Sequence, residues 1–76
     1  DAEKKRTLCA RLARVEGQLR GIQKLIEDEA DCEKVAQQLS AARKALDKTF
    51  YAMLGCMIEE GDQPVSQVSE MLVKFA

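Results

Sequence analysis

Residues 31–61 read DCEKVAQQLSAARKALDKTFYAMLGCMIEEG, and the rest of the architecture follows from them. Apolar positions recur at alternating steps of four and three residues, the spacing that places side chains on one face of an α-helix. Asp31 is a favourable residue for capping the start of a helix, and Gly61 is favourable just beyond a helix end. The stretch therefore predicts one unbroken helix over 31–60.

A second apolar series precedes this helix. Between Leu8 and Ile26 the apolar residues again step by four and three, which predicts a helix over 3–28. The turn that joins the two helices is short and acidic, so they are expected to form a helical hairpin.

The C-terminal residues predict a third, shorter helix. Asp62 is a good cap, Pro64 suits a first helical turn, and the apolar residues from Val65 to Phe75 keep helical spacing. No useful stretch alternates with a period of two residues. We therefore expect an all-α fold, a single domain over residues 1–76 with two long helices and one short helix.

The length of the chain favours an oligomer. A domain of 76 residues buries little apolar surface alone, and a single hairpin leaves much of each apolar face uncovered. Two hairpins make an antiparallel four-helix bundle, so a two-fold homodimer is the expected unit.

Composition narrows the class of protein further. Neither a signal peptide nor an apolar run long enough to cross a bilayer is visible, and three scattered cysteines suit a reducing compartment, so we expect a soluble, cytoplasmic protein without a membrane partner. The sequence has no histidine, no phosphate-binding loop and no pair of a nucleophile with a base. An enzyme is not expected.

Two of the cysteines lie near opposite ends of the second helix. Cys32 and Cys56 are separated by about 36 Å of helix, whereas a disulfide needs Cα atoms within about 7 Å. Only an antiparallel pairing with a second copy can bring these two thiols together. Facing Cys32 with Cys56 of that copy also pairs three sets of apolar-stripe residues, namely Val35 with Met53, Leu39 with Thr49, and Ala42 with Leu46.

The cysteines admit a structural and a chemical interpretation. The first turn of the helix favours a thiolate at Cys32, whereas the neighbouring acidic residues oppose its ionisation. Cys56 and Cys9 can equally be interpreted as small apolar residues of the core. Without histidine, nickel, cobalt and zinc lack their usual ligands. Two thiolates, Cys32 and Cys56, with a thioether such as Met57 would suit Cu(I). No cofactor is required by the sequence.

Basic residues gather on the first two helices and suggest a surface for phosphates, although a solvated helix face is an equally good interpretation of composition alone. The candidates for DNA contact are Lys4, Lys5, Arg6, Arg11, Arg14, Arg43 and Lys48.

Three segments together resemble the copper-sensitive operon repressor family (CsoR, RcnR, FrmR and the sulfur-responsive CstR). They are residues 11–22 (RLARVEGQLRGI), Asp31-Cys32, and residues 38–42 (QLSAA). The resemblance implies an all-helical dimer that pairs into a tetramer and represses transcription without a helix-turn-helix. It also implies that an inducer bound between subunits releases operator DNA, and that Arg11 and Lys48 match DNA-contacting positions, with Arg14 as a companion.

The sensing positions depart from the family pattern. Cys32 matches the family's cysteine, but Met57 stands where metal sensors of the family have a histidine, and Gly61 stands at the last ligand position. Cys56 has no counterpart in those branches. Formaldehyde sensors of the family pair the cysteine with an N-terminal proline, which Asp1 does not match.

These departures favour a repressor released from its operator when reactive sulfur species, a persulfide or polysulfide, modify an intersubunit site of Cys32 and Cys56. The alternatives are a Cu(I)-sensing repressor of metal efflux and a sensor of formaldehyde-type electrophiles. A carrier of metal or sulfane sulfur, and a plain helical adaptor, are further alternatives.

Overall fold

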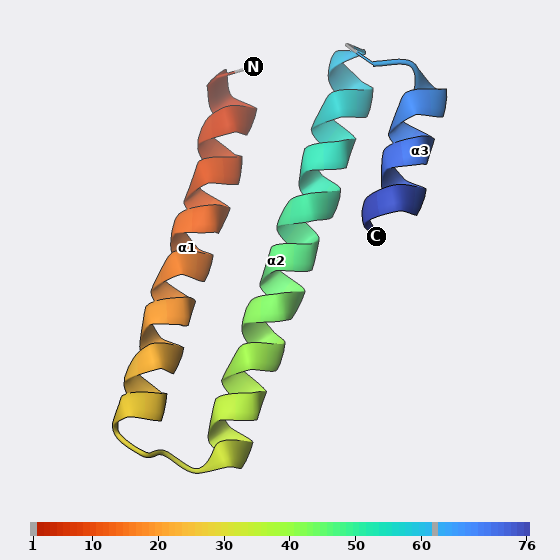
Figure 1. Cartoon of the computed structure of the whole chain (residues 1–76). Helices are drawn as coiled ribbons and strands as arrows, with labels where there is room; N and C mark the ends of the chain where they lie inside the picture. Colours follow the sequence, from red (N-terminus) through yellow and green to blue (C-terminus); the bar gives the residue numbers. More distant parts are fainter. Residues whose placement is uncertain (1, 62) are drawn as a thin grey trace.

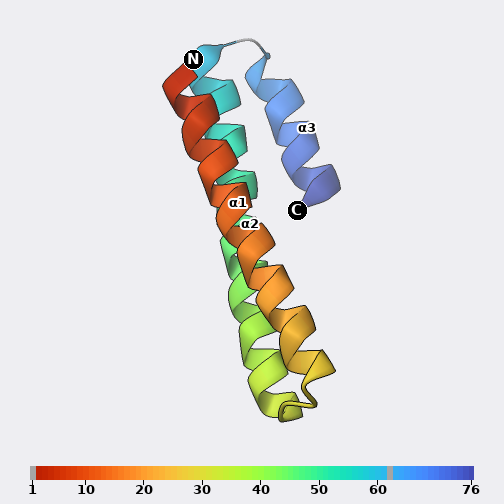
Figure 2. The same ribbon diagram turned by 90° about the vertical axis from the view of Figure 1, so that its left-hand side faces the viewer.

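The computed structural model describes residues 2–61 and 63–76, and these residues form three helices without any strand. They are α1 (Ala2–Glu27), α2 (Cys32–Glu60) and α3 (Val65–Phe75). The long helices run antiparallel and side by side, and the short helix folds back beside the C-terminal part of α2 (Figures 1 and 2). The all-α class with two long helices and one short helix is confirmed.

Both predicted ends of α2 are correct because local backbone chemistry fixes them. The Glu33 backbone N–H donates to the Asp31 carboxylate at 3.4 Å, so Asp31 caps the helix as expected. At the other end Gly61 adopts φ 67°, and its N–H donates to the carbonyls of Met57 and Ile58, each at 3.2 Å. That left-handed conformation suits glycine, which has no Cβ to clash.

The start of α3 differs from the prediction. Pro64 stands at the N-cap position, with φ −59° and ψ 146°, and the first helical residue is Val65. The extended ψ of Pro64 prevents the helix from including it, while its carbonyl accepts from the N–H groups of Gln67 at 3.0 Å and Val68 at 3.2 Å. The predicted cap, Asp62, lies outside the described residues.

The core of a single subunit is thin. The Cα positions span 48 × 27 × 12 Å, and no described side chain is less than 2% exposed. The residues buried within the α1–α2 hairpin are Val15, Ile22, Ala42 and Thr49. Leu54 and Val68 are buried where α3 folds back on α2.

Much of the apolar stripe therefore remains exposed. Residues spaced by seven share one side of a helix, and the six large apolar residues with this spacing on the long helices are between 45% and 59% exposed. We call them the apolar face: Leu12, Leu19 and Ile26 on α1, with Leu39, Leu46 and Met53 on α2. The predicted apolar stripe of α2 therefore has two parts: Ala42 and Thr49 are buried within the hairpin, whereas the residues of the apolar face remain exposed.

No helix in the described part of the chain is long and apolar enough to cross a membrane.

Candidate functional site

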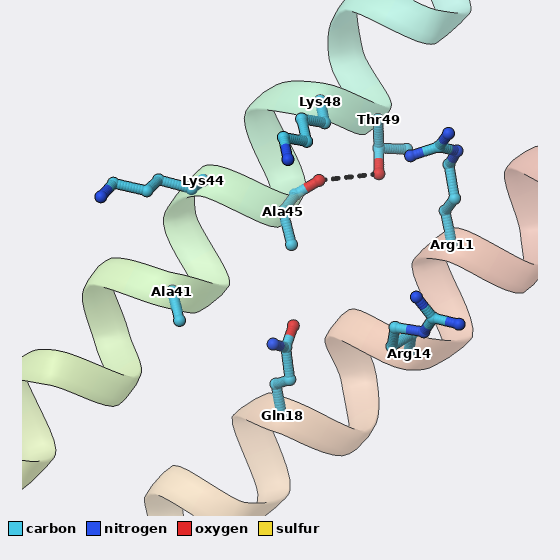
Figure 3. A pocket seen from close by; sticks show the side chains of 8 residues that line it. All are labelled: Arg11, Arg14, Gln18, Ala41, Lys44, Ala45, Lys48 and Thr49. Carbon is cyan, nitrogen blue, oxygen red and sulfur yellow. Dashed lines mark hydrogen bonds between the residues drawn. The ribbon is translucent and has the colours of Figure 1, made fainter.

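Cationic side chains from both long helices line one groove between them. Arg11 and Arg14 come from α1, and Lys44 and Lys48 come from α2 (Figure 3). The groove has a volume of about 440 Å³ and no acidic side chain lines it. We call these four residues the basic groove. Four positive charges around one hollow would attract a polyanion such as a nucleic acid backbone.

Two polar residues complete the lining of the basic groove. Thr49 is buried, and its hydroxyl donates to the Ala45 carbonyl at 3.0 Å, so this side chain is satisfied within α2. The Gln18 side chain points from α1 toward α2, and its Oε1 atom is buried without a hydrogen-bond partner (Figure 3). An amide left in this state is available to a ligand or to water in the groove.

The remaining basic residues predicted for DNA contact lie elsewhere. Arg43 lines a separate hollow formed by Ala36, Leu39 and Ser40. Lys4 and Lys5 lie at the open end of the hairpin, and Arg6 is exposed without lining any of these hollows. Arg11, Arg14 and Lys48 are thus the predicted residues that the fold brings together. Lys44 joins them because it lies one helical turn before Lys48.

Cys32 is a free, exposed thiol at the first residue of α2. It lines a hollow of about 370 Å³ in which its neighbours are apolar, among them Ile26, Val35 and Leu39. The thiol is therefore open to small reagents and lies beside the apolar face.

Cys56 lies at the other end of the hairpin and has a neighbour that sequence analysis did not identify. Cys9 of α1 and three residues of α2, Met53, Cys56 and Met57, line one hollow of about 270 Å³. We call these four residues the sulfur pocket. Within one chain Cys56 therefore lies near Cys9, while Cys32 lies at the opposite end of α2, as expected.

An ion pair closes this end of the hairpin. The Lys4 ammonium donates to the Glu59 carboxylate; the Lys4 side chain is 35% exposed and the Glu59 side chain 63% exposed. This hydrogen bond raises the pKa of Lys4 above its usual value, and the negative charges of Glu59, Cys56 and Glu60 act in the same direction. Lys4 is thus held close to Cys56 at the open end of the hairpin.

Two signals in the sequence could have located the sulfur pocket. Met53, Cys56 and Met57 have the i, i+3, i+4 spacing of one helix face. Pairing Lys4 with Glu59 would have set the α1–α2 register and placed Cys9 near them. Among residues 2–61 and 63–76 no group of three or more His, Cys, Asp or Glu side chains is arranged to hold a metal ion.

Comparison with known proteins gives a consistent result. The family model described as metal-sensitive transcriptional repressor matches residues 4–73. The chain is also 29% identical to the copper-sensing transcriptional repressor CsoR of Bacillus subtilis (strain 168), in an alignment covering 97% of this chain and 83% of that protein. No solved structure gives a significant match.

Proposed function

Because the chain belongs to the metal-sensitive transcriptional repressor family, we propose that it binds operator DNA through the basic groove and leaves the DNA when Cys32 is modified. The observation that carries the DNA-binding part is that Arg11, Arg14, Lys44 and Lys48 all line one hollow. Binding would rest on phosphate contacts, so affinity should fall steeply as the salt concentration rises.

A second copy of the chain is part of this proposal. The apolar face lies beside Cys32 and exposes large side chains that an antiparallel copy would bury. The homodimer would place Cys32 of each subunit toward Cys56 of the other. It would also present basic grooves on its outer surface, and two dimers would combine into a homotetramer that contacts more phosphates.

The proposed inducer is a persulfide or polysulfide. The Cys32 thiolate attacks the outer sulfur of a persulfide R–S–S–H, which gives Cys32–S–S–H and releases R–S⁻. The Cys56 thiolate of the second copy then attacks the Cys32 sulfur, forming an intersubunit disulfide and expelling hydrosulfide, HS⁻. Exposure of Cys32 supports the first step, because a small persulfide can reach the thiol from solvent.

A covalent bridge affects DNA only if the two states of the protein differ in geometry. An intersubunit disulfide would hold two α2 helices at one distance, and it would shift the assembly toward whichever conformation fits that distance. In the proposed mechanism, the basic grooves of the assembly in this conformation no longer match the spacing of the DNA phosphates.

A Cu(I)-responsive repressor is the second candidate. The Bacillus subtilis relative is named as a copper sensor, and this chain has thiol and thioether sulfur but no histidine. Cys32 with Cys56 and Met57 of a second copy would provide the soft ligands that Cu(I) prefers.

One experiment separates the two inducers. Operator release would be measured by fluorescence anisotropy after addition of sodium polysulfide, Cu(I) under anaerobic conditions, or formaldehyde, for wild type, Cys32→Ala and Cys56→Ala. We expect polysulfide to release wild type but neither variant, and mass spectrometry to find a Cys32–Cys56 cross-linked dimer. A normal polysulfide response in Cys32→Ala would refute the proposed trigger, and release by Cu(I) alone would favour the second candidate.

A further inference from the structure

Four of the six sulfur-containing side chains of this protein line one hollow. The chain has three cysteines and three methionines, and the hollow at the open end of the hairpin contains Cys9, Met53, Cys56 and Met57. This is the end where the N-terminal part of α1 meets the C-terminal part of α2 (Figure 1). The i, i+3, i+4 spacing directs the three α2 side chains to one face, and Cys9 approaches from the facing helix.

We propose that the sulfur pocket binds one Cu(I) ion within a single chain, with the Cys9 and Cys56 thiolates and the thioethers of Met53 and Met57 as its ligands. The inference does not rest on the proposed function. The ligand set lacks Cys32 and requires neither a second copy nor DNA.

The donor atoms fit a soft monovalent ion. Thiolate and thioether sulfur select Cu(I), whereas nickel, cobalt and zinc sites ordinarily use imidazole, carboxylate or several thiolates. On binding, each of the two thiols releases its proton to solvent and the copper keeps its oxidation state. Methionine has three rotatable bonds, so both thioethers can adjust to the ion inside a hollow of about 270 Å³.

The charges around the pocket suit this ligand set. Two thiolates and one Cu(I) ion leave a net charge of −1. Lys4 and Lys5 line the same hollow and would offset that charge, with Glu60 as the acidic side chain among its lining residues. The lining of the pocket therefore provides positive charge beside the proposed anionic complex.

Anaerobic Cu(I) titration in competition with a coloured Cu(I) chelator tests the inference. Wild type and Cys32→Ser should bind one Cu(I) per chain, with ultraviolet charge-transfer absorption from thiolate to copper. Cys9→Ser and Cys56→Ser should each weaken binding by more than about 100-fold, because losing even a group behind a ligand costs about 10- to 100-fold. Circular dichroism confirms that each variant keeps its helices.

Methionine variants provide a matched comparison. Met53→Leu combined with Met57→Leu keeps side-chain volume but removes both thioethers, and should weaken Cu(I) binding at least about 10-fold. Met71→Leu removes the third methionine, which lies on α3 outside the pocket, and should bind Cu(I) like wild type. Equal effects of the two changes would overturn the assignment of the thioethers.

A mixing experiment tests whether the site lies within one chain. Cys9→Ser and Cys56→Ser subunits carrying different affinity tags would be co-expressed and purified together. A site confined to one chain stays broken in the mixed assembly, whereas a site shared between subunits regains Cu(I) binding. Regained binding would overturn the inference, as would loss of Cu(I) binding in Cys32→Ser or its absence in wild type. A polysulfide response that persists in Cys9→Ser would leave the proposed function standing in each case.

Discussion

Lys4 on α1 forms an ion pair with Glu59 on α2 at the open end of the hairpin. Its pKa is raised because its ammonium donates a hydrogen bond to Glu59, and Glu59→Gln removes that partner's charge. We predict that the Lys4 pKa, measured by NMR titration, falls toward the ordinary value in Glu59→Gln. Because the folded pKa is the higher one, the contribution of Lys4 to stability is complete at neutral pH and is lost as the pH rises through that raised pKa. An unchanged Lys4 pKa would mean that Glu59 is not the main cause.

The basic groove makes a different prediction about single residues. Arg14→Ala and Lys48→Ala should weaken binding to operator and to unrelated DNA alike. Each should also reduce the steepness of the plot of log affinity against log salt concentration, by about one for every phosphate that the side chain neutralises. Arg43→Ala is the matched control, because it removes the same type of charge from a separate hollow. If Arg43→Ala reduces the slope as much as Arg14→Ala does, the basic groove is not the main DNA surface.

At the scale of helices, the ends of α2 were predictable because capping is local. Asp31 and Gly61 interact with groups within four residues of themselves, so their neighbours in sequence contain the needed information. The predicted start of α3 was two residues too early, because Pro64 can occupy the first helical turn or the N-cap, and these positions differ mainly in ψ. The closeness of Cys9 to Cys56 depends on the register of α1 against α2. The periodicity within each helix does not determine that register.

Two glycines provide a test of helix stability in opposite directions. Gly61→Ala should destabilise the protein by about 1 kcal/mol, since an L-residue is strained at φ 67°. Gly17→Ala should stabilise it by up to about 1 kcal/mol, because the glycine lies inside α1 and an added Cβ meets nothing within 4 Å. Thermal unfolding followed by circular dichroism measures both. Destabilisation by Gly17→Ala would indicate that another subunit packs closely against that part of α1.

At the scale of the whole molecule, the apolar face is the surface whose large side chains a single chain leaves exposed. Leu39→Glu and Leu46→Glu place charges on exposed positions of α2 that a second copy would bury. We predict that both variants sediment as smaller species than wild type in analytical ultracentrifugation and unfold at lower temperature, because the proposed dimer would link folding to association. Val73→Glu, at an 86% exposed position on α3, is the control and should keep the wild-type assembly. Wild-type sedimentation of Leu39→Glu and Leu46→Glu would argue against pairing through α2.

The thinness of the subunit has a consequence for gene control. If the chain pairs as proposed, a body whose Cα positions span only 12 Å in one direction, and in which no described side chain is fully buried, would gain most of its stability by associating. Below the concentration at which subunits pair, the chain would lack both a stable fold and a complete DNA surface. Repression should therefore respond to the amount of protein in the cell with a threshold, and a modest fall in synthesis near that threshold would relieve repression without any inducer.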